Sequence, residues 1–214
     1  MLSDLHNSYV NNTCPDNLSG LRDFVLVGLL VASEKEKMLA GELYNPLDDE
    51  LSQARGRARR LCRMLNATRD DETAERSRIL GELLGRTGAG LWIEPPFYCD
   101  YGAIITLGEK VFFNFNCVIL DPAQVVIGDR VLCGPAVQIY TAMHPLSAEE
   151  RQTGLEYAKP VSIESDVWIG GAAVICPGVS VGARSVIGAG SVVTRDVPTG
   201  VFAAGNPCRI IREL

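Results

Sequence analysis

The chain has 214 residues, of which 47% are hydrophobic, and it carries a formal net charge of −6. A chain of this length and composition buries a sizeable core, so we expect one domain with an appendage. An acidic chain lacks the concentrated basic surface that phosphate groups require, so we expect no nucleic acid as a partner.

Residues 1–33 show no repeating pattern, and we expect them to form a poorly ordered leader. Their one apolar stretch, residues 24–32, is too short to span a bilayer, and no basic segment or small-residue cleavage site accompanies it. The seven cysteines of the chain are scattered without a C-x-x-C pair, which is typical of reduced thiols. We therefore expect no membrane partner and a cytoplasmic location.

Residues 34–90 have helical patterns and form the second predicted unit. Ser33 and Glu36 have the spacing of a capping box before a short first helix. Two longer helices are predicted over residues 48–65 and 71–84. A basic run in the first of these is expected to be a solvated face; it comprises Arg55, Arg57, Arg59, Arg60 and Arg63. We expect the helices to cover one end of the structure that follows, a role that is compatible with walling a substrate site.

Residues 91–214 are dominated by an apolar β-branched residue that returns every six residues. The longest unbroken series comprises Ile163, Ile169, Ile175, Val181, Ile187 and Val193. This period fits neither a helix nor an ordinary strand, and it predicts a solenoid in which three short strands form one coil of about eighteen residues. The same period slips by two residues between Val125 and Ile127. Glycines that follow a repeat residue, such as Gly170, are expected to supply positive φ at the corners.

The period stops after Ile139, and residues of about 140–160 are expected to leave the solenoid as an excursion loop. This loop contains His144, one of only two histidines, between a solenoid strand and Pro145. A neutral imidazole anchored in this way is suited to act as a general base, whereas a lone histidine without context is more often structural. Two histidines cannot supply a three-histidine zinc site, so we expect no metal.

Six segments of the chain stand out as motifs: EKEKMLAGELYNP, IEPPFYCDYG, FFNFNCVILD, YTAMHP, KPVSIESDVWIGGAAVICPGVSVGARSVIGAGSVVTRDVP and GNPCRIIREL. They resemble the maltose and galactoside O-acetyltransferases, a branch of the hexapeptide-repeat acyltransferases, over residues 34–214. The resemblance implies a mainly β fold, a left-handed parallel β-helix preceded by a short α-helical segment. It also implies a homotrimer that binds acetyl-CoA between neighbouring subunits and forms no covalent acyl-enzyme.

The resemblance further implies roles for individual residues. His144 matches the catalytic base, and Asn114 matches the asparagine whose amide hydrogen-bonds the acceptor hydroxyl or the thioester. Asp100 and Asp121 match polar groups on the acceptor side. Positions along acetyl-CoA, from the thioester to the nucleotide phosphates, are matched by Trp168, Gly171, Ala189, Thr194, Arg195, Arg209 and Arg212.

The chain departs from the galactoside enzymes at Pro46 and Pro122, where those enzymes have acidic residues. The maltose branch also lacks these acids, and from the resemblance we expect an acetyl-CoA-dependent O-acetyltransferase that acts on a sugar hydroxyl of a maltose-like or glucose-like acceptor. A related acetyltransferase with an amino-sugar or other acceptor is the first alternative, and a non-catalytic solenoid scaffold is the second.

Overall fold

The computed structural model describes residues 32–214 of the chain. The leader predicted for residues 1–33 lies outside the described residues, apart from its last two.

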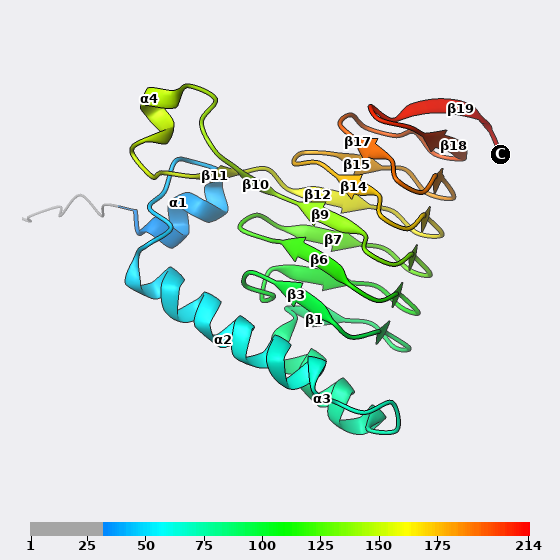
Figure 1. Ribbon diagram of the computed structural model, residues 1–214, viewed down its shortest axis with the longest axis horizontal. Coiled ribbons are helices and arrows are strands. Elements are labelled where there is room, and N and C mark those ends of the chain that lie inside the picture. The colour runs from blue at the N-terminus through cyan, green and yellow to red at the C-terminus, as the bar shows by residue number, and fades with distance from the viewer. Residues whose placement is uncertain (1–31) are drawn as a thin grey trace, which may run out of the picture. The chain divides into compact units, whose positions relative to one another are not determined.

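Three helices precede the first strand (Figure 1): α1 Glu34–Ala40, α2 Asp49–Asn66 and α3 Thr73–Leu83. All three helical predictions are confirmed, and so is the capping box of Ser33 and Glu36. Asp48 caps α2, because its side chain accepts from the N–H groups of Glu50 and Leu51. The apolar face of α2 is buried against the rest of the domain.

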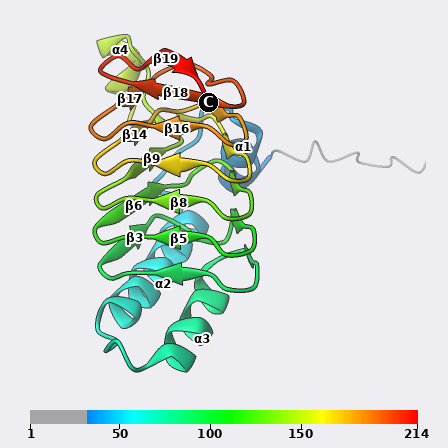
Figure 2. The same cartoon turned by 90° about the vertical axis from the view of Figure 1, so that its right-hand side faces the viewer.

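From residue 86 the chain winds into a prism whose three faces are sheets of parallel strands, apart from the last strand of the second sheet (Figures 1 and 2). The first sheet contains β1 Arg86–Thr87, β4 Ile105–Leu107, β7 Val125–Ile127, β12 Val161–Ile163 and β15 Ser180–Val181. The second sheet contains β2 Trp92–Ile93, β5 Phe112–Phe113, β8 Leu132–Cys133, β13 Trp168–Ile169, β16 Val186–Ile187, β18 Val201–Ala204 and β19 Arg209–Glu213. The third sheet contains β3 Phe97–Cys99, β6 Cys117–Leu120, β9 Gln138–Tyr140, β14 Val174–Ile175 and β17 Val192–Val193. This arrangement confirms the predicted solenoid.

The repeat residues point into the prism and form its core. Ile169, Ile175 and Val181, for example, are fully buried. The register of the upper coils follows the predicted eighteen residues, since Trp168 pairs with Val186.

The lower coils are longer, and the extra residues all enter at the corner between the third and first sheets. Ile119 of the third sheet is followed in the first sheet by Ile127, two residues later than a strict six would place it. Cys99 and Leu107 have the same spacing. The excursion loop enters at this corner too and contains β10 Ala142–Met143, α4 Ala148–Arg151 and β11 Tyr157–Ala158. The two-residue slip in the sequence therefore marks one corner, which we call the variable corner.

The predicted reason for the repeat glycines is wrong. Gly170 does not have positive φ; it is required because an added Cβ would lie 2.5 Å from the N atom of Ala189 in the next coil. Positive φ occurs instead at the tips of the turns, as at Arg130 (φ 56) and Asp166 (φ 63). The side chains of these two residues form a bidentate ion pair across neighbouring coils.

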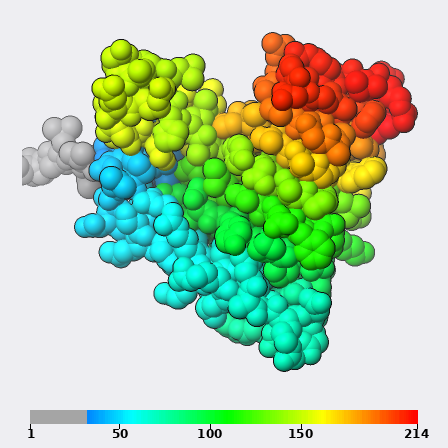
Figure 3. Space-filling model, in the orientation of Figure 1, coloured from blue at the N-terminus to red at the C-terminus, as the bar shows by residue number. Residues whose placement is uncertain are grey.

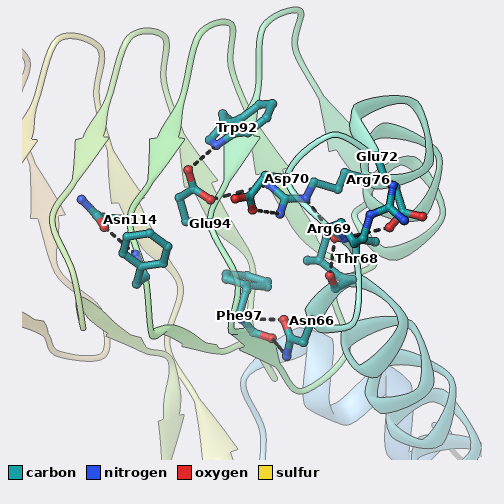
Figure 4. Close-up of polar contacts among 12 residues, drawn as sticks. Asn66, Thr68, Arg69, Asp70, Glu72, Arg76, Trp92, Glu94, Phe97 and Asn114 are labelled. Atoms are coloured by element: carbon teal, nitrogen blue, oxygen red, sulfur yellow. Dashed lines mark hydrogen bonds and ion pairs between the residues drawn. The ribbon is translucent and has the colours of Figure 1, made fainter.

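Helices α2 and α3 lie at the end of the prism formed by its first coil (Figures 1 and 2). The buried Arg76 of α3 contacts Thr68 and Asp70, and it lies over the ring of Trp92 (Figure 4). At the other end, β19 runs antiparallel to β18. Within residues 32–214, no helix combines the length and apolar character needed to cross a membrane.

Candidate functional site

A cleft of about 470 Å³ lies at the variable corner, where the helical segment and the excursion loop meet the prism. Figure 3 shows the loop standing out from the body of the molecule beside the helical segment. The cleft is lined by Tyr44, Pro46, Leu47, Arg55, Arg59, Asp100, Tyr101, Leu120, Pro122, Ala142, His144 and Glu156. Two predicted site residues, His144 and Asp100, therefore share one cleft.

His144 follows β10, which pairs with β11 to form the base of the excursion loop. Its side chain is 58% exposed, and its Nε2 lies 3.9 Å from Oε1 of Glu156. The adjoining Pro145 is buried. The loop thus anchors the backbone on both sides of an imidazole that is open to the cleft.

Asp121 lies beneath the cleft wall and does not line the cleft, which corrects the expectation that it contacts an acceptor. Its side chain is fully buried and accepts hydrogen bonds from the N–H groups of Asp100, Tyr101 and Gly102 at 2.9, 3.0 and 2.7 Å. Burial raises the pKa of Asp121 to about 7, although the three donors favour the carboxylate. Asp121 holds the turn that presents Asp100.

Two arginines of α2, Arg55 and Arg59, line the cleft. Arg59 is exposed, as predicted for a solvated face, whereas Arg55 is half-buried and departs from that prediction. Arg55 donates to the phenol oxygen of Tyr101 at 2.7 Å and to the carbonyl of Pro46. Burial raises the pKa of Asp100, and the guanidinium groups of Arg59 and Arg55 oppose that shift. The cleft wall therefore holds charges of both signs beside hydrogen-bonding groups.

A second group of predicted residues lies at the corner between the second and third sheets. Asn114, Gly171 and Ala189 each follow a strand of the second sheet, in three different coils. Trp168 belongs to β13 of the same sheet and is 55% exposed. The Oδ1 atom of Asn114 accepts from the N–H of Phe115 (Figure 4).

The single chain does not bring Asn114 to His144. The two residues lie at opposite ends of the strands of the third sheet, since Asn114 precedes β6 and His144 follows β9. The four residues of β6 alone span about 10 Å at roughly 3.3 Å per residue.

Two of the predicted phosphate ligands meet near the C-terminal end. Arg195 and Arg209 line a shallow pocket of about 330 Å³, together with Asp196 and Cys208. Thr194 adjoins Arg195 in sequence and is exposed. Arg212 does not line this pocket. Its guanidinium lies 6.0 Å from the ring centre of Phe202.

The sequence interpretation missed Tyr44, Arg55, Arg59 and Glu156 as cleft residues. The available signal was the two-residue slip, because the lengthened turns and the excursion loop all enter at the corner where the cleft lies. No group of three metal-ligating side chains occurs among residues 32–214.

Known proteins share both parts of this structure. Residues 37–88 match the maltose acetyltransferase hexapeptide capping motif, and residues 160–195 match the hexapeptide repeat of succinyl-transferase. The galactoside O-acetyltransferase of Escherichia coli is 41% identical over 179 residues, which cover 84% of this chain and 88% of that protein.

Two solved structures are similar throughout the described domain. A maltose O-acetyltransferase from Clostridium difficile superposes with a TM-score of 0.85 at 46% identity, covering 86% of this chain and 98% of that one. A hexapeptide-repeat acetyltransferase from Vibrio cholerae, solved with acetyl coenzyme A, has a TM-score of 0.80 at 45% identity and covers 86% of this chain and 99% of that one.

The solenoid with a six-residue repeat and its helical cap place the chain in the class of hexapeptide-repeat acyltransferases. The chain belongs to the family of maltose and galactoside O-acetyltransferases and is an acetyltransferase.

Proposed function

We propose that this enzyme transfers the acetyl group of acetyl-CoA to a hydroxyl of a maltose-like or glucose-like sugar, with His144 as the general base. The observation that carries the proposal is the cleft in which an open imidazole faces both acidic and basic side chains. Such groups suit a sugar, whose hydroxyls both donate and accept hydrogen bonds. Arg55 and Asp100 are the cleft residues that we assign to holding the acceptor.

In the proposed reaction the sugar oxygen attacks the thioester carbonyl carbon while His144 takes the hydroxyl proton. The tetrahedral oxyanion is held by the N–H of Gly171, which donates to no acceptor within residues 32–214. The carbon–sulfur bond then breaks, and the imidazolium returns its proton to the departing thiolate. The products are the acetylated sugar and free CoA.

We assign acetyl-CoA to the corner of Asn114, Gly171 and Ala189, with Trp168 beside the pantetheine arm. Gly171 packs against Pro135, and an added Cβ would lie 3.2 Å from that residue, so a larger residue would shift the backbone N–H that we assign to the oxyanion. For the nucleotide phosphates we propose Arg195 and Arg209, which share a pocket, and further contacts from Thr194 and Arg212.

We propose a homotrimer, and the position of Asn114 supports sites that are shared between subunits. Asn114 and His144 lie at opposite ends of the strands of one sheet, so a second copy of the chain is needed to bring them together. Mixing inactive Asn114→Ala and His144→Ala chains tests this. Random assembly should restore about one quarter of the sites. Mixed oligomers that stay inactive would contradict the shared site, as would a fully active monomer.

The test of the activity itself is thiol release from acetyl-CoA with a panel of maltose, glucose, galactosides and glucosamine. Sugar-dependent release from a hydroxyl acceptor supports the proposal, and transfer to the amine of glucosamine would identify the alternative acceptor class. If none of these sugars increases the rate of thiol release, the acceptor is not a sugar of this kind.

The role of His144 is tested by replacement. His144→Ala should lower kcat by at least ~10², while binding of acetyl-CoA changes little, because a base acts in the transition state. Equal losses of rate and affinity would instead mark a structural histidine.

We place the enzyme in the cytoplasm, which is supported by the six free cysteines among residues 32–214.

A further inference from the structure

Tyr44 and Glu156 lie 112 residues apart in the sequence and are joined by three hydrogen bonds. The N–H of Tyr44 donates to the carbonyl of Glu156 at 2.9 Å, and the N–H of Glu156 donates to the carbonyl of Tyr44 at 3.1 Å. The phenol of Tyr44 donates to Oε2 of Glu156 at 2.9 Å. The linker between α1 and α2 is thereby tied to the excursion loop.

This contact fixes the carboxylate of Glu156. Tyr44 is only 1% exposed and packs with Met38, Leu51 and Tyr101, so its phenol cannot follow a moving partner. With Oε2 held by the phenol, the other oxygen, Oε1, points toward His144. Oε1 lies 3.9 Å from Nε2, so a hydrogen bond between them requires the exposed imidazole to turn toward Glu156.

We propose that Glu156, held by Tyr44, is a positioning residue that orients His144 and stabilises its imidazolium form during acetyl transfer. This inference rests on the function proposed above. A carboxylate that accepts from Nε2–H selects the tautomer in which Nδ1 is free to take the acceptor proton. The same negative charge favours the protonated imidazole that forms when the sugar oxygen attacks.

Other charged and titratable groups surround the cleft, on α2 and on the turn after β3. They are Arg55, Arg59, Asp100 and Tyr101. Among the described residues, Glu156 is the only acidic side chain within 4 Å of the imidazole of His144. The effect of its charge on His144 can therefore be separated from that of the others by substitution.

The experiment compares Glu156→Gln with Glu150→Gln, an exposed glutamate of the same loop. Glu156→Gln keeps the backbone bridge and an acceptor for the phenol, but it loses the charge. We expect kcat to fall at least ~10-fold with both KM values within about twofold, and the acid-side inflection of kcat against pH to move to lower pH. Glu150→Gln should match the wild type.

Tyr44→Phe frees the carboxylate without removing its charge, so we expect a smaller fall in kcat, about threefold to tenfold. An unchanged kcat and an unchanged inflection in Glu156→Gln would overturn the inference, as would a lowered melting temperature with normal kinetics. The result with His144→Ala distinguishes a failure of this inference from a failure of the proposed function. If His144→Ala is inactive while Glu156→Gln is normal, only this inference fails; if His144→Ala is active, the proposed base itself is wrong.

Discussion

The side-chain amide of Asn66 pairs with both main-chain polar groups of Phe97 (Figure 4). Its Nδ2 donates to the carbonyl of Phe97 at 3.0 Å, and its Oδ1 accepts from the N–H of Phe97 at 2.8 Å. Asn66 is the last residue of α2 and Phe97 begins β3, so this pair fastens the helical segment to the first coil.

Asn66→Ala should destabilise the enzyme because it leaves two main-chain groups beside the buried Phe97 without partners. We expect a loss of about 1–3 kcal/mol, measured by urea unfolding at one protein concentration. Gln53→Ala, an exposed change on the same helix, serves as the control and should be nearly neutral. Equal stability of both variants would show that the clamp contributes nothing.

Glycines should respond to alanine according to what lies next to them. In Gly170→Ala the new Cβ meets backbone at 2.5 Å, and we expect a loss of about 1–3 kcal/mol. In Gly56→Ala, on α2, no atom lies within 4 Å, and we expect a gain of about 0.5–1 kcal/mol from helix propensity. Melting temperatures of the two variants should therefore move in opposite directions, and a shift in the same direction would refute the explanation.

Asp121 should make stability depend on pH. Its folded pKa of about 7 lies above the ordinary value, so the folded state binds the proton more tightly. That contribution is complete below about pH 4 and is lost as pH rises toward 7. The stability of the wild type minus that of Asp121→Asn should therefore shrink over this range. A difference that grows with pH would show that the three N–H donors outweigh burial.

Trp168 should report the binding of CoA. It is 55% exposed on the proposed cofactor side, whereas the indole N–H of Trp92 donates to Glu94 near the helical cap. We expect CoA to change tryptophan emission in the wild type and not in Trp168→Phe, with Trp92 as a constant background. A response that survives in Trp168→Phe would place the ligand elsewhere.

The solenoid was predictable because one physical rule governs it. A position that returns every six residues always faces the interior, so Ile163 and Val193 need the same kind of side chain. The helices were predictable for a similar reason, since Ser33 and Asp48 carry local capping signals.

The cleft was less accessible to sequence reasoning because no period relates its members. Tyr44 and Glu156 meet only after the excursion loop folds back on the helical segment. Arg55 belongs to a basic run that has the composition of a solvated face, and its contacts with Tyr101 and Pro46 are not visible in the sequence. An aspartate such as Asp121 looks like a ligand-binding group until its three main-chain donors are known.

All variation in coil length is confined to the variable corner, while the other two corners keep their spacing of six. The variable corner therefore accommodates insertions, and the other two corners keep a constant spacing. Loops of new length grafted after Leu120 or Tyr140 would reshape the cleft that we propose for the acceptor without disturbing the stacking at the corner between the second and third sheets. A chain built on this plan can change the cleft that we propose for the acceptor while the corner that we propose for acetyl-CoA stays the same.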